Sequence, residues 1–506
     1  MAQKALFPKS ITREEINSLV DKAADIIRTA TDYKFILVLL FLKRISDTWQ
    51  EEFEEKKQEF LKYLDEKTAE KEAENEVYHT FNLRRDLLWD RITGDIKKLP
   101  ENLSNALIKI AELNPELKGV IDKFSFLNFT SQEHREKLRQ LVELFNQYNF
   151  SNKYVSSDII GNAYEHILYR FAPTQAKEGE VYTPREVIEL LVNILDPKPG
   201  ESVYDPSCGS GGMLIISHKY VREKYGKEKR LLLYGQEYNS DIYGLCKLNL
   251  VAHGITDAFV EFGDSLLYPR HTEGGRLKQF DVVIANVPWN EDGYGEEILK
   301  RADFKERFSF GYPPNNTADW AWVQHMLASA KENGRVGLVV DNGCLFRGGA
   351  ERSIRSKIVE KDWIECVILT PEKLFYNTGA PGAIIIFRKN KPQERKNKIL
   401  FINASNEYIS HPSLRRLNML SKENINKIVE AYRKFTNISG FSKVVDISEV
   451  RKNDYNLNVT LYVMPIEENE QIDIFKEFSE LKELGKERQE IEKKIEEYVT
   501  ELSKVW

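Results

Sequence analysis

A glycine-rich turn in the middle of the chain has the composition of a ligand-binding loop. The stretch SVYDPSCGSGGMLI, residues 202–215, runs from an apolar segment through Asp205 into a cluster of glycines and then into helix-forming residues. Glycines allow a backbone to contact a ligand closely, and the start of a helix offers free N–H groups. A dinucleotide-binding loop would have a further glycine where Leu214 stands. The chain also contains no G-K-[ST] phosphate loop, which argues against an ATP-driven motor.

Polar residues follow several other apolar segments. Glu237 ends LLLYGQE and Asp264 follows the short apolar stretch of EFGDSLLYP. An acidic side chain at the end of a second strand can bind two ribose hydroxyls, although acidic strand ends are also common without a function. FDVVIANVPWN ends in Asn286 and Pro288, which suit an ordinary turn as well as a catalytic loop. Thr183, followed by proline, predicts the N-cap of a helix.

These motifs lie among short apolar segments that alternate with helical stretches. The predicted strands are SVYDP, LLLYGQE, FDVVIAN, RVGLVVDN, IECVILTP and AIIIFRK. Alternation of strands and helices predicts a mostly parallel sheet covered on both faces. Ligands of such α/β sheets bind outside the carboxyl ends of the strands, where the connecting loops lie.

Changes in the pattern of apolar and charged residues divide the chain into four parts. We expect an N-terminal helical domain over 1–150, the sheet domain over 151–400, a connector over 401–470 and a C-terminal helical arm over 471–506. Apolar residues of the last part fit a heptad spacing that Arg488 interrupts: Leu481, Leu484, Ile491, Ile495, Tyr498, Leu502 and Val505. Roughly three heptads are short for a self-sufficient coiled coil. The segment is therefore either a helix docked on the core or, as we favour, an arm that binds a partner.

Composition excludes several classes of protein. A net charge of −6 argues against binding nucleic acid by bulk charge, while a local basic cleft stays open. The longest apolar run, FILVLLFL, is far shorter than the ~20 residues that cross a bilayer, and the N-terminal residues have no apolar signal core. The four cysteines form no C-x-x-C pair, so we expect no zinc site and a reducing compartment. The sequence predicts a cytoplasmic, multidomain protein without a membrane span or a metal.

Taken in order, the motifs resemble those of the S-adenosylmethionine-dependent amino methyltransferases of DNA. D-P-x-C-G-S-G-G is similar to their cofactor loop, and the residues at 286–289 are similar to their N-P-P-[FYW] catalytic loop. The order of the motifs is that of the N6-adenine branch called gamma. More narrowly, the chain resembles the modification (M) subunit of type I restriction–modification systems, through YKFILVLLFLKRISD, DIIGNAYEHILYRFA, GEVYTP, YPPNNTADWAWVQHML, GCLFRGGAE and LTPEKLFYNTGAPGAIIIF.

This resemblance implies a Rossmann-like methyltransferase sheet that binds S-adenosylmethionine. It implies that Thr183 lies near the cofactor carboxylate, Glu237 binds the ribose hydroxyls and Asp264 binds the adenine amino group. The resemblance implies direct methyl transfer without a metal. The cofactor-binding residues that it implies are Tyr182, Thr183, Asp205, Ser207, Gly209, Gly211, Glu237 and Asp264.

The catalytic residues implied by the resemblance are Asn286, Val287, Pro288 and Trp289. The N6 amine of adenine is a poor nucleophile, because its lone pair is delocalised into the ring. The Asn286 side-chain oxygen and the Val287 backbone carbonyl would accept its two hydrogens and localise that lone pair. Pro288 would stiffen the loop, and Trp289 would stack on a base extruded from the duplex. Val287 stands where the family has its first proline, and we expect activity to survive because the chemistry uses the carbonyl.

The resemblance also implies partners. Only about 115 residues follow the last predicted strand, too few for an obvious second domain that recognises a DNA target. In the family, a separate specificity (S) subunit selects the site, with two M subunits for each S subunit. A further restriction (R) subunit supplies ATP-dependent translocation and cleavage. The heptads at the C-terminus are candidates for docking to the S subunit.

Three alternatives remain open at this point. A methyltransferase of protein glutamine or of RNA can share the catalytic loop, although the N-terminal helices and the RISD and YPPNNTADW stretches favour DNA. A self-sufficient DNA methyltransferase would need the recognition domain that we do not find. A catalytically idle DNA-binding scaffold would explain Val287, but not the joint presence of Asp205, Glu237, Asp264 and Asn286.

Overall fold

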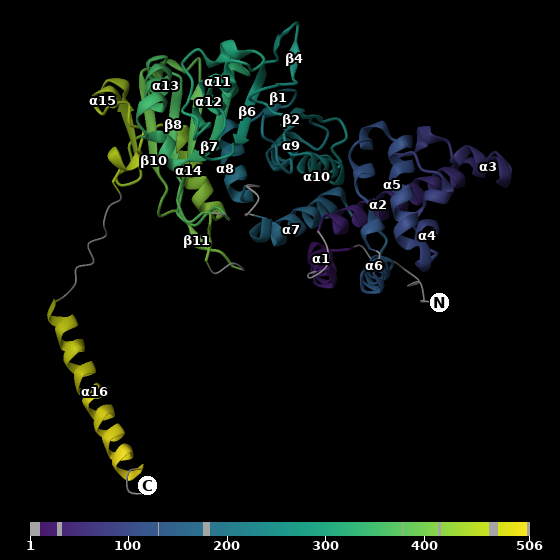
Figure 1. Ribbon diagram of the computed structural model, residues 1–506, viewed down its shortest axis with the longest axis horizontal. Coiled ribbons are helices and arrows are strands. Elements are labelled where there is room, and N and C mark those ends of the chain that lie inside the picture. The colour runs from purple at the N-terminus through teal and green to yellow at the C-terminus, as the bar shows by residue number, and fades with distance from the viewer. Residues whose placement is uncertain are drawn as a thin grey trace. The chain divides into compact units, whose positions relative to one another are not determined.

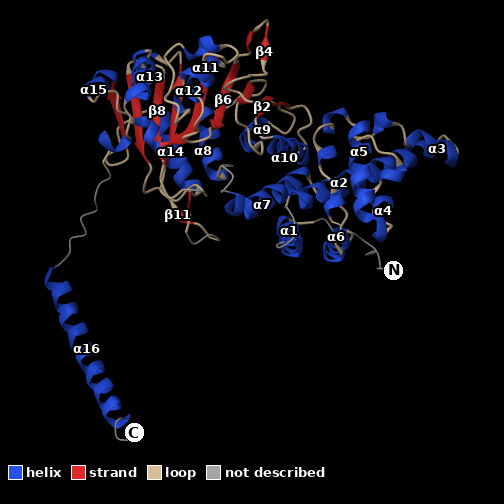
Figure 2. Ribbon diagram, viewed as in Figure 1, coloured by secondary structure: helices blue, strands red, loops and turns tan. Residues whose placement is uncertain are grey.

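The computed structural model describes residues 11–27, 33–129, 131–175, 183–376, 378–412, 416–464 and 474–502 (Figures 1 and 2). The chain divides into two compact units after Val463. None of the described helices combines the length and apolar character that crossing a bilayer requires. The first unit contains the sheet and the N-terminal helices, and the second contains the helix near the C-terminus.

Within the described residues, nine strands form one mostly parallel sheet in the order β13-β10-β8-β9-β7-β6-β1-β2-β3. The block β7-β6-β1-β2-β3 is parallel throughout, and β9 runs antiparallel between β7 and β8. All of the predicted strands are present, because each is an apolar run that the sheet buries. The strands are β1 (Ser202–Asp205), β2 (Leu232–Glu237), β3 (Phe259–Phe262), β6 (Phe280–Asn286), β7 (Ala330–Asp341), β8 (Ile364–Leu369), β9 (Gly382–Arg388), β10 (Lys398–Asn403) and β13 (Ser442–Asp446). Two small hairpins pair β4 (Thr272–Glu273) with β5 (Arg276–Leu277), and β11 (Ile409–Ser410) with β12 (Asn418–Met419).

Helices cover both faces of the sheet, as expected for an α/β fold (Figure 2). The apolar cluster of one face includes side chains from α11 (Glu296–Leu299), α12 (Asp319–Ala328), α13 (Gly349–Glu360) and α15 (Ile447–Lys452). The cluster of the other face includes side chains from α8 (Arg185–Leu195), α9 (Gly212–Tyr225), α10 (Ser240–Ala252) and α14 (Lys422–Lys434). Burial of these two layers fixes the sheet whose strand ends carry the motifs.

The N-terminal region is helical and has its own apolar cluster. Its helices are α1 (Arg13–Ile27), α2 (Lys34–Phe60), α3 (Glu66–Ala73), α4 (Trp89–Ile92), α5 (Leu99–Leu113), α6 (Gln132–Phe145) and α7 (Ser157–Gln175). The first turns of α2 are buried on all sides because they are formed by the apolar run FILVLLFL. The cluster also includes Leu245, Leu248 and Ala252 of α10, so this region packs against the sheet domain through α10.

The predicted connector over 401–470 is wrong for residues 401–463. Strands β10 and β13 extend the sheet, and α14 between them covers it. The β10 stretch KILFIN is almost fully buried, and β13 pairs with it antiparallel as the edge strand. A long helical and polar insertion separates the two strands in sequence.

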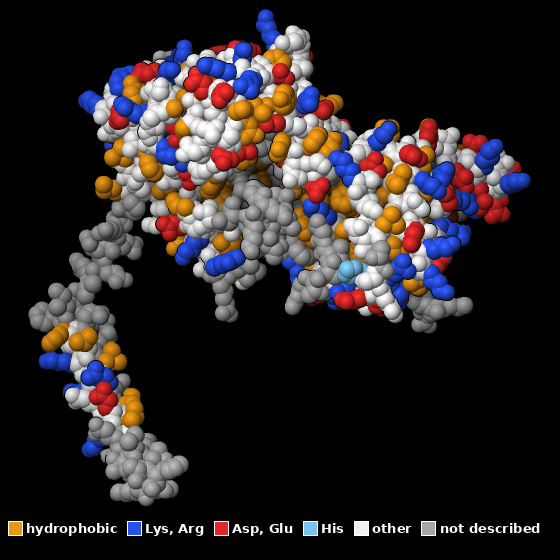
Figure 3. Space-filling view, viewed as in Figure 1, with side chains coloured by type: hydrophobic (Ala, Val, Ile, Leu, Met, Phe, Trp, Pro, Cys, Tyr) orange, Lys and Arg blue, Asp and Glu red, His pale blue; other side chains and the backbone are white. Residues whose placement is uncertain are grey.

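The second unit contains one long helix, α16 (Ile474–Leu502). Apolar side chains are visible along the described part of this helix in Figure 3, among many charged ones. Leu481, Leu484, Ile491 and Ile495 are all more than half exposed, with exposed fractions of 68%, 64%, 57% and 55%. These four heptad residues are therefore not buried within the second unit.

Candidate active site

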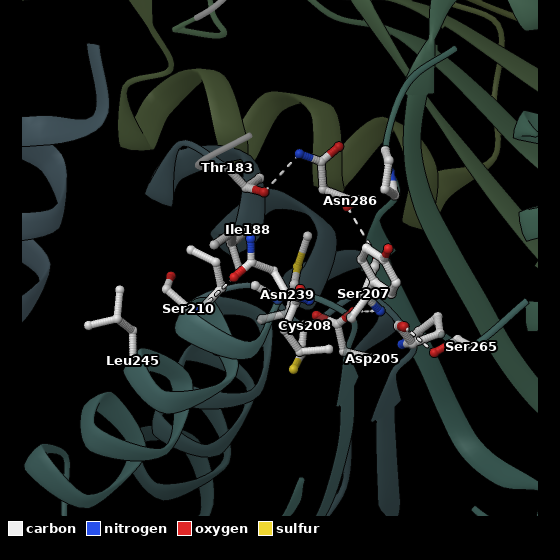
Figure 4. A pocket seen from close by; sticks show the side chains of 18 of the residues that line it. Thr183, Ile188, Asp205, Ser207, Cys208, Ser210, Asn239, Leu245, Ser265 and Asn286 are labelled. Atoms are coloured by element: carbon white, nitrogen blue, oxygen red, sulfur yellow. Dashed lines mark hydrogen bonds between the residues drawn. The ribbon is translucent and has the colours of Figure 1, made fainter. Parts of the chain in front are cut away.

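The predicted motifs meet at the carboxyl ends of four neighbouring parallel strands. Asp205 ends β1, Glu237 ends β2, Asp264 follows β3 and Asn286 ends β6. These residues line one cavity of about 540 Å³, shown in part in Figure 4. Strands that run in the same direction bring their ends to one edge of the sheet, which is why residues eighty positions apart lie together.

Two hydrogen bonds orient the Asn286 side chain. Its Nδ2 donates to the Thr183 hydroxyl at 2.9 Å, as Figure 4 shows, and its Oδ1 accepts from the indole Nε1 of Trp289 at 3.1 Å. Because the indole N–H can only donate, Trp289 requires the amide oxygen on its side and so places the NH₂ group toward the Thr183 hydroxyl. The Ser207 hydroxyl also donates to the Asn286 backbone carbonyl at 3.4 Å. The tip of β6 is thus tied to the glycine-rich loop and to the segment before α8.

The next residues of the loop differ in whether they line the cavity. The Val287 side chain is fully buried in the apolar cluster on one face of the sheet, so this residue anchors the loop. Pro288 and Trp289 line the cavity. The Trp289 ring packs edge-on against Phe375, with 4.7 Å between the ring centroids and 68° between the planes. A Cβ at Gly382 would lie 2.9 Å from the indole, so the start of β9 must be glycine for Trp289 to occupy this position.

The glycine-rich loop wraps the end of β2. The Gly209 N–H donates to Oε2 of Glu237 at 2.9 Å, and the Asn239 N–H donates to Oε1 at 2.8 Å. Gly211 is the N-cap of α9 with φ +85°, and a Cβ there would lie 3.1 Å from the Cys246 Sγ. That combination of positive φ and crowding requires glycine. The predicted loop is therefore a close backbone turn beside an acidic side chain.

The cavity wall is strongly acidic. Asp205 is 1% exposed, and burial raises the pKa of its carboxyl well above the usual range. Burial also raises the pKa of Glu237, and it raises the pKa of Glu291 to about 7. Arg185 lines the same cavity, but Glu165 and Glu189 already form ion pairs with it. A positively charged ligand would relieve the cost of burying these carboxyl groups.

The predicted capping role of Thr183 is wrong. Helix α8 begins at Arg185 with Pro184 in the N-cap position, so Thr183 lies one residue too early to cap it. Its hydroxyl faces Asn286 and lines the cavity instead. Tyr182 lies outside the described residues. Of the described candidates, Gly211 and Val287 do not line the cavity, whereas all the others do.

The sequence analysis missed a cluster of residues after the predicted catalytic loop. The Tyr294 hydroxyl donates to Oδ2 of Asp264 at 2.9 Å, and the Trp322 indole donates to Oε2 of Glu291 at 3.2 Å. All four residues line the cavity. The available signal was an acidic and an aromatic residue within five positions after Trp289, together with the aromatic ADWAW stretch.

Comparisons with known proteins identify the family of this chain. The family model of the N-6 DNA methylases matches residues 155–471, and that of the HsdM N-terminal domain matches residues 16–145. The type I restriction enzyme MjaVII methylase subunit of Methanocaldococcus jannaschii is 46% identical over 510 residues, which cover 97% of this chain and 85% of that protein. The HindI methylase subunit of Haemophilus influenzae is 30% identical over 406 residues, which cover 77% and 87% of the two chains.

A solved structure shares both the fold and the domain content. The methyltransferase subunit of a type I restriction–modification system from Streptococcus thermophilus superposes with a TM-score of 0.78 at 25% identity. The superposition covers 90% of this chain and all of that one. The chain belongs to the N-6 DNA methylase family, among the methylase subunits of type I restriction enzymes.

Proposed function

We propose that this chain transfers a methyl group from S-adenosylmethionine to N6 of adenine in DNA, as the methylase subunit of a type I restriction enzyme. The observation that carries this proposal is the oriented Asn286 amide at the wall of an acidic cavity that also contains the predicted cofactor loop. Family membership supplies the class of substrate. The geometry of the cavity supports our proposal for the residues that would act.

The cofactor fits the residues that line the cavity. Asp205, Ser207 and the Gly209 backbone would hold its methionine part, and Asp205 is a buried carboxyl with the Ser207 N–H as its backbone donor, at 3.1 Å. Glu237 would hold the ribose hydroxyls. Asp264 would accept the adenine amino group at the oxygen that now accepts from Tyr294. When bound, S-adenosylmethionine supplies a methyl group made electrophilic by the positively charged sulfur.

Asn286 and Val287 would activate the target amine. The Asn286 Oδ1 accepts from Trp289 but has a second lone pair, so it can accept one N–H of the adenine amine as well. The Val287 backbone carbonyl lies between Asn286 and Pro288, which both line the cavity, and it would accept the other N–H although Val287 itself does not line the cavity. In one displacement the amine lone pair would form the new N–C bond while the bond between that methyl carbon and sulfur breaks and its electron pair stays on sulfur. S-adenosylhomocysteine is then the leaving group, and one amine proton passes to solvent. Holding the amine in this geometry supplies much of the rate enhancement.

The target base must leave the duplex to reach this cavity, since its amine is inaccessible inside a base-paired stack. Trp289 lines the cavity next to Asn286 and would stack on the extruded base. Phe375 supports the indole from the side. This packing lets the ring serve as a rigid platform.

We further propose that a separate specificity subunit selects the DNA site, with two copies of this chain for each specificity subunit. An ATP-dependent restriction subunit would complete the enzyme. The apolar residues at heptad spacing on α16 support a role as the docking arm. We place the enzyme in the cytoplasm with the DNA that it modifies.

The test follows a labelled methyl group from S-adenosylmethionine into plasmid DNA, with and without the specificity subunit. RNA and total protein serve as competing acceptors in the same reactions. We expect label in DNA only when the specificity subunit is present. Label in DNA with this chain alone would make it a self-sufficient enzyme. Label in RNA or protein would refute the assignment of DNA as the substrate.

A further inference from the structure

Two segments outside the proposed mechanism fold onto the residue that follows the catalytic loop. Asn290 comes directly after Trp289 and has φ +53°, a left-handed conformation that residues other than glycine rarely adopt. Its side chain lines no part of the cavity. The segments that contact it are the NTADW stretch at the start of α12 and the LFRGG stretch before α13.

Hydrogen bonds fix both the backbone and the side chain of Asn290. Its backbone N–H donates to Oδ1 of Asp319 at 3.1 Å, and its side-chain Oδ1 accepts from Nη1 of Arg347 at 2.7 Å. Asp319 is fully buried. The two contacts fix the backbone and the side chain of Asn290 at once, which is how an unfavourable φ persists in a folded protein.

Arg347 is in turn held by three carboxylates. It forms an ion pair with Asp319, donates from Nη1 to Asp341 at 2.9 Å and donates from Nε to Glu351 at 2.7 Å. The planar guanidinium presents several donors in a fixed fork, so one arginine can bridge these acceptors and Asn290 together. Lysine offers a single point charge and cannot reproduce that set of bonds.

We infer that Asp319 and Arg347 are positioning residues for the proposed methyl transfer, because they clamp Asn290 and thereby hold the catalytic loop. The loop is fixed at its first residue by Thr183 and Ser207, which bond to Asn286. The contacts of Asp319 and Arg347 with Asn290, which we call the clamp, fix the other end of the loop. The Val287 carbonyl and the Trp289 ring lie between the two anchors, so their geometry depends on both. This inference rests on the proposed function.

The clamp has a specific kinetic signature. Neither Asp319 nor Arg347 lines the cavity, so their loss leaves the cofactor contacts in place. A loop released at one end misplaces the groups that hold the amine, and a displacement of about 1 Å can lower the rate about 100-fold. The expected change is therefore in kcat, with the dissociation constant of the cofactor unchanged.

The experiment compares Arg347→Ala, Arg347→Lys and Asn290→Ala with a matched control, Arg352→Ala. Arg352 belongs to α13 and pairs with Asp454 on the surface, so the control removes an arginine and an ion pair without touching the loop. Hydrogen exchange at the Asn290 amide is measured on the free chain. Cofactor binding and single-turnover methylation are measured on the complex with the specificity subunit.

We expect faster exchange at Asn290 and a 10- to 100-fold lower kcat, as an order of magnitude, for Arg347→Ala, with a partial recovery in Arg347→Lys. In the Asn290→Ala background the hydrogen bond between Arg347 and the Asn290 side chain is already absent. Arg347→Ala should therefore lower kcat less in that background than it does in the wild type. Unchanged exchange and kcat in Arg347→Ala, or equal losses in the control, would overturn the inference. An inactive wild-type complex would count against the proposed function instead, while the exchange data would still decide whether the clamp exists. If Arg347→Ala does not fold, Asn290→Ala decides, because Asn290 is exposed.

Discussion

The hydrogen bond between Thr183 and Asn286 offers the sharpest perturbation of the proposed chemistry. Thr183→Val replaces the hydroxyl that accepts from Asn286 Nδ2 with a methyl group of similar size. The shape of the wall is kept and one orienting bond is lost. The remaining bond from Trp289 still favours the productive amide orientation, because the indole can only donate.

The magnitude follows from one hydrogen bond of ordinary strength. A lost bond of this kind costs about 0.5–1.5 kcal/mol. If the bond serves to orient the amide in the transition state, kcat should fall by about 2- to 10-fold. The double variant Thr183→Val, Trp289→Phe removes both orienting bonds and should lose more than either single change, up to about 100-fold.

The assay separates this role from the one that the sequence resemblance implied for Thr183. An orienting role lowers kcat and leaves cofactor affinity unchanged, and a role at the cofactor carboxylate weakens cofactor binding. Thr183→Ser keeps the acceptor and should behave as wild type. Full activity of Thr183→Val, with normal cofactor binding, would refute the account of the Asn286 orientation.

Three further changes test other parts of the account. Glu237→Gln places an NH₂ group against one of the two backbone N–H groups that now donate to the carboxylate. Cofactor affinity measured by calorimetry should therefore fall about 10-fold or more, and an unchanged affinity would remove Glu237 from the proposed ribose site. Burial raises the pKa of Glu291 from 4.5 to about 7, so its contribution to folding stability is present below pH 4.5 and is lost as the pH rises through 7. The melting temperature of Glu291→Gln should therefore fall less between pH 4.5 and pH 7 than that of the wild type. Parallel curves of melting temperature against pH for the two proteins would contradict the shift. Truncation after Val463 should leave the melting temperature and cofactor binding unchanged while abolishing co-purification with the specificity subunit, and retained co-purification would exclude α16 as the docking arm.

Most of the sheet was predictable because most of its strands are buried apolar runs, which are visible in the sequence. FDVVIAN and AIIIFRK are too apolar and too short to be anything but core strands once turn residues bound them. β13 escaped prediction because an edge strand of five residues, SKVVD, has only two strongly apolar positions. Its identity depends on pairing with β10, which is a tertiary contact that local pattern does not encode.

The site was predictable where a motif ends a strand and unpredictable where a side chain arrives from elsewhere. Asp205 and Asn286 follow directly from the rule that ligands bind at the ends of parallel strands. The role of Thr183 was misjudged because a threonine before proline satisfies a capping pattern, while its actual partner lies 103 positions away. Trp322 reaches the cavity from a helix on one face of the sheet, and spacing in the sequence gives no measure of that approach.

The measurement that tests the central claim most directly is the identity of the methylated nucleoside. DNA modified by the complex of this chain with its specificity subunit is digested and analysed by mass spectrometry, for the wild type and for Asn286→Ala. The account predicts N6-methyladenine with the wild type and none with the variant, while both bind S-adenosylmethionine equally. Methylated cytosine, or N6-methyladenine made at the wild-type rate by Asn286→Ala, would contradict it.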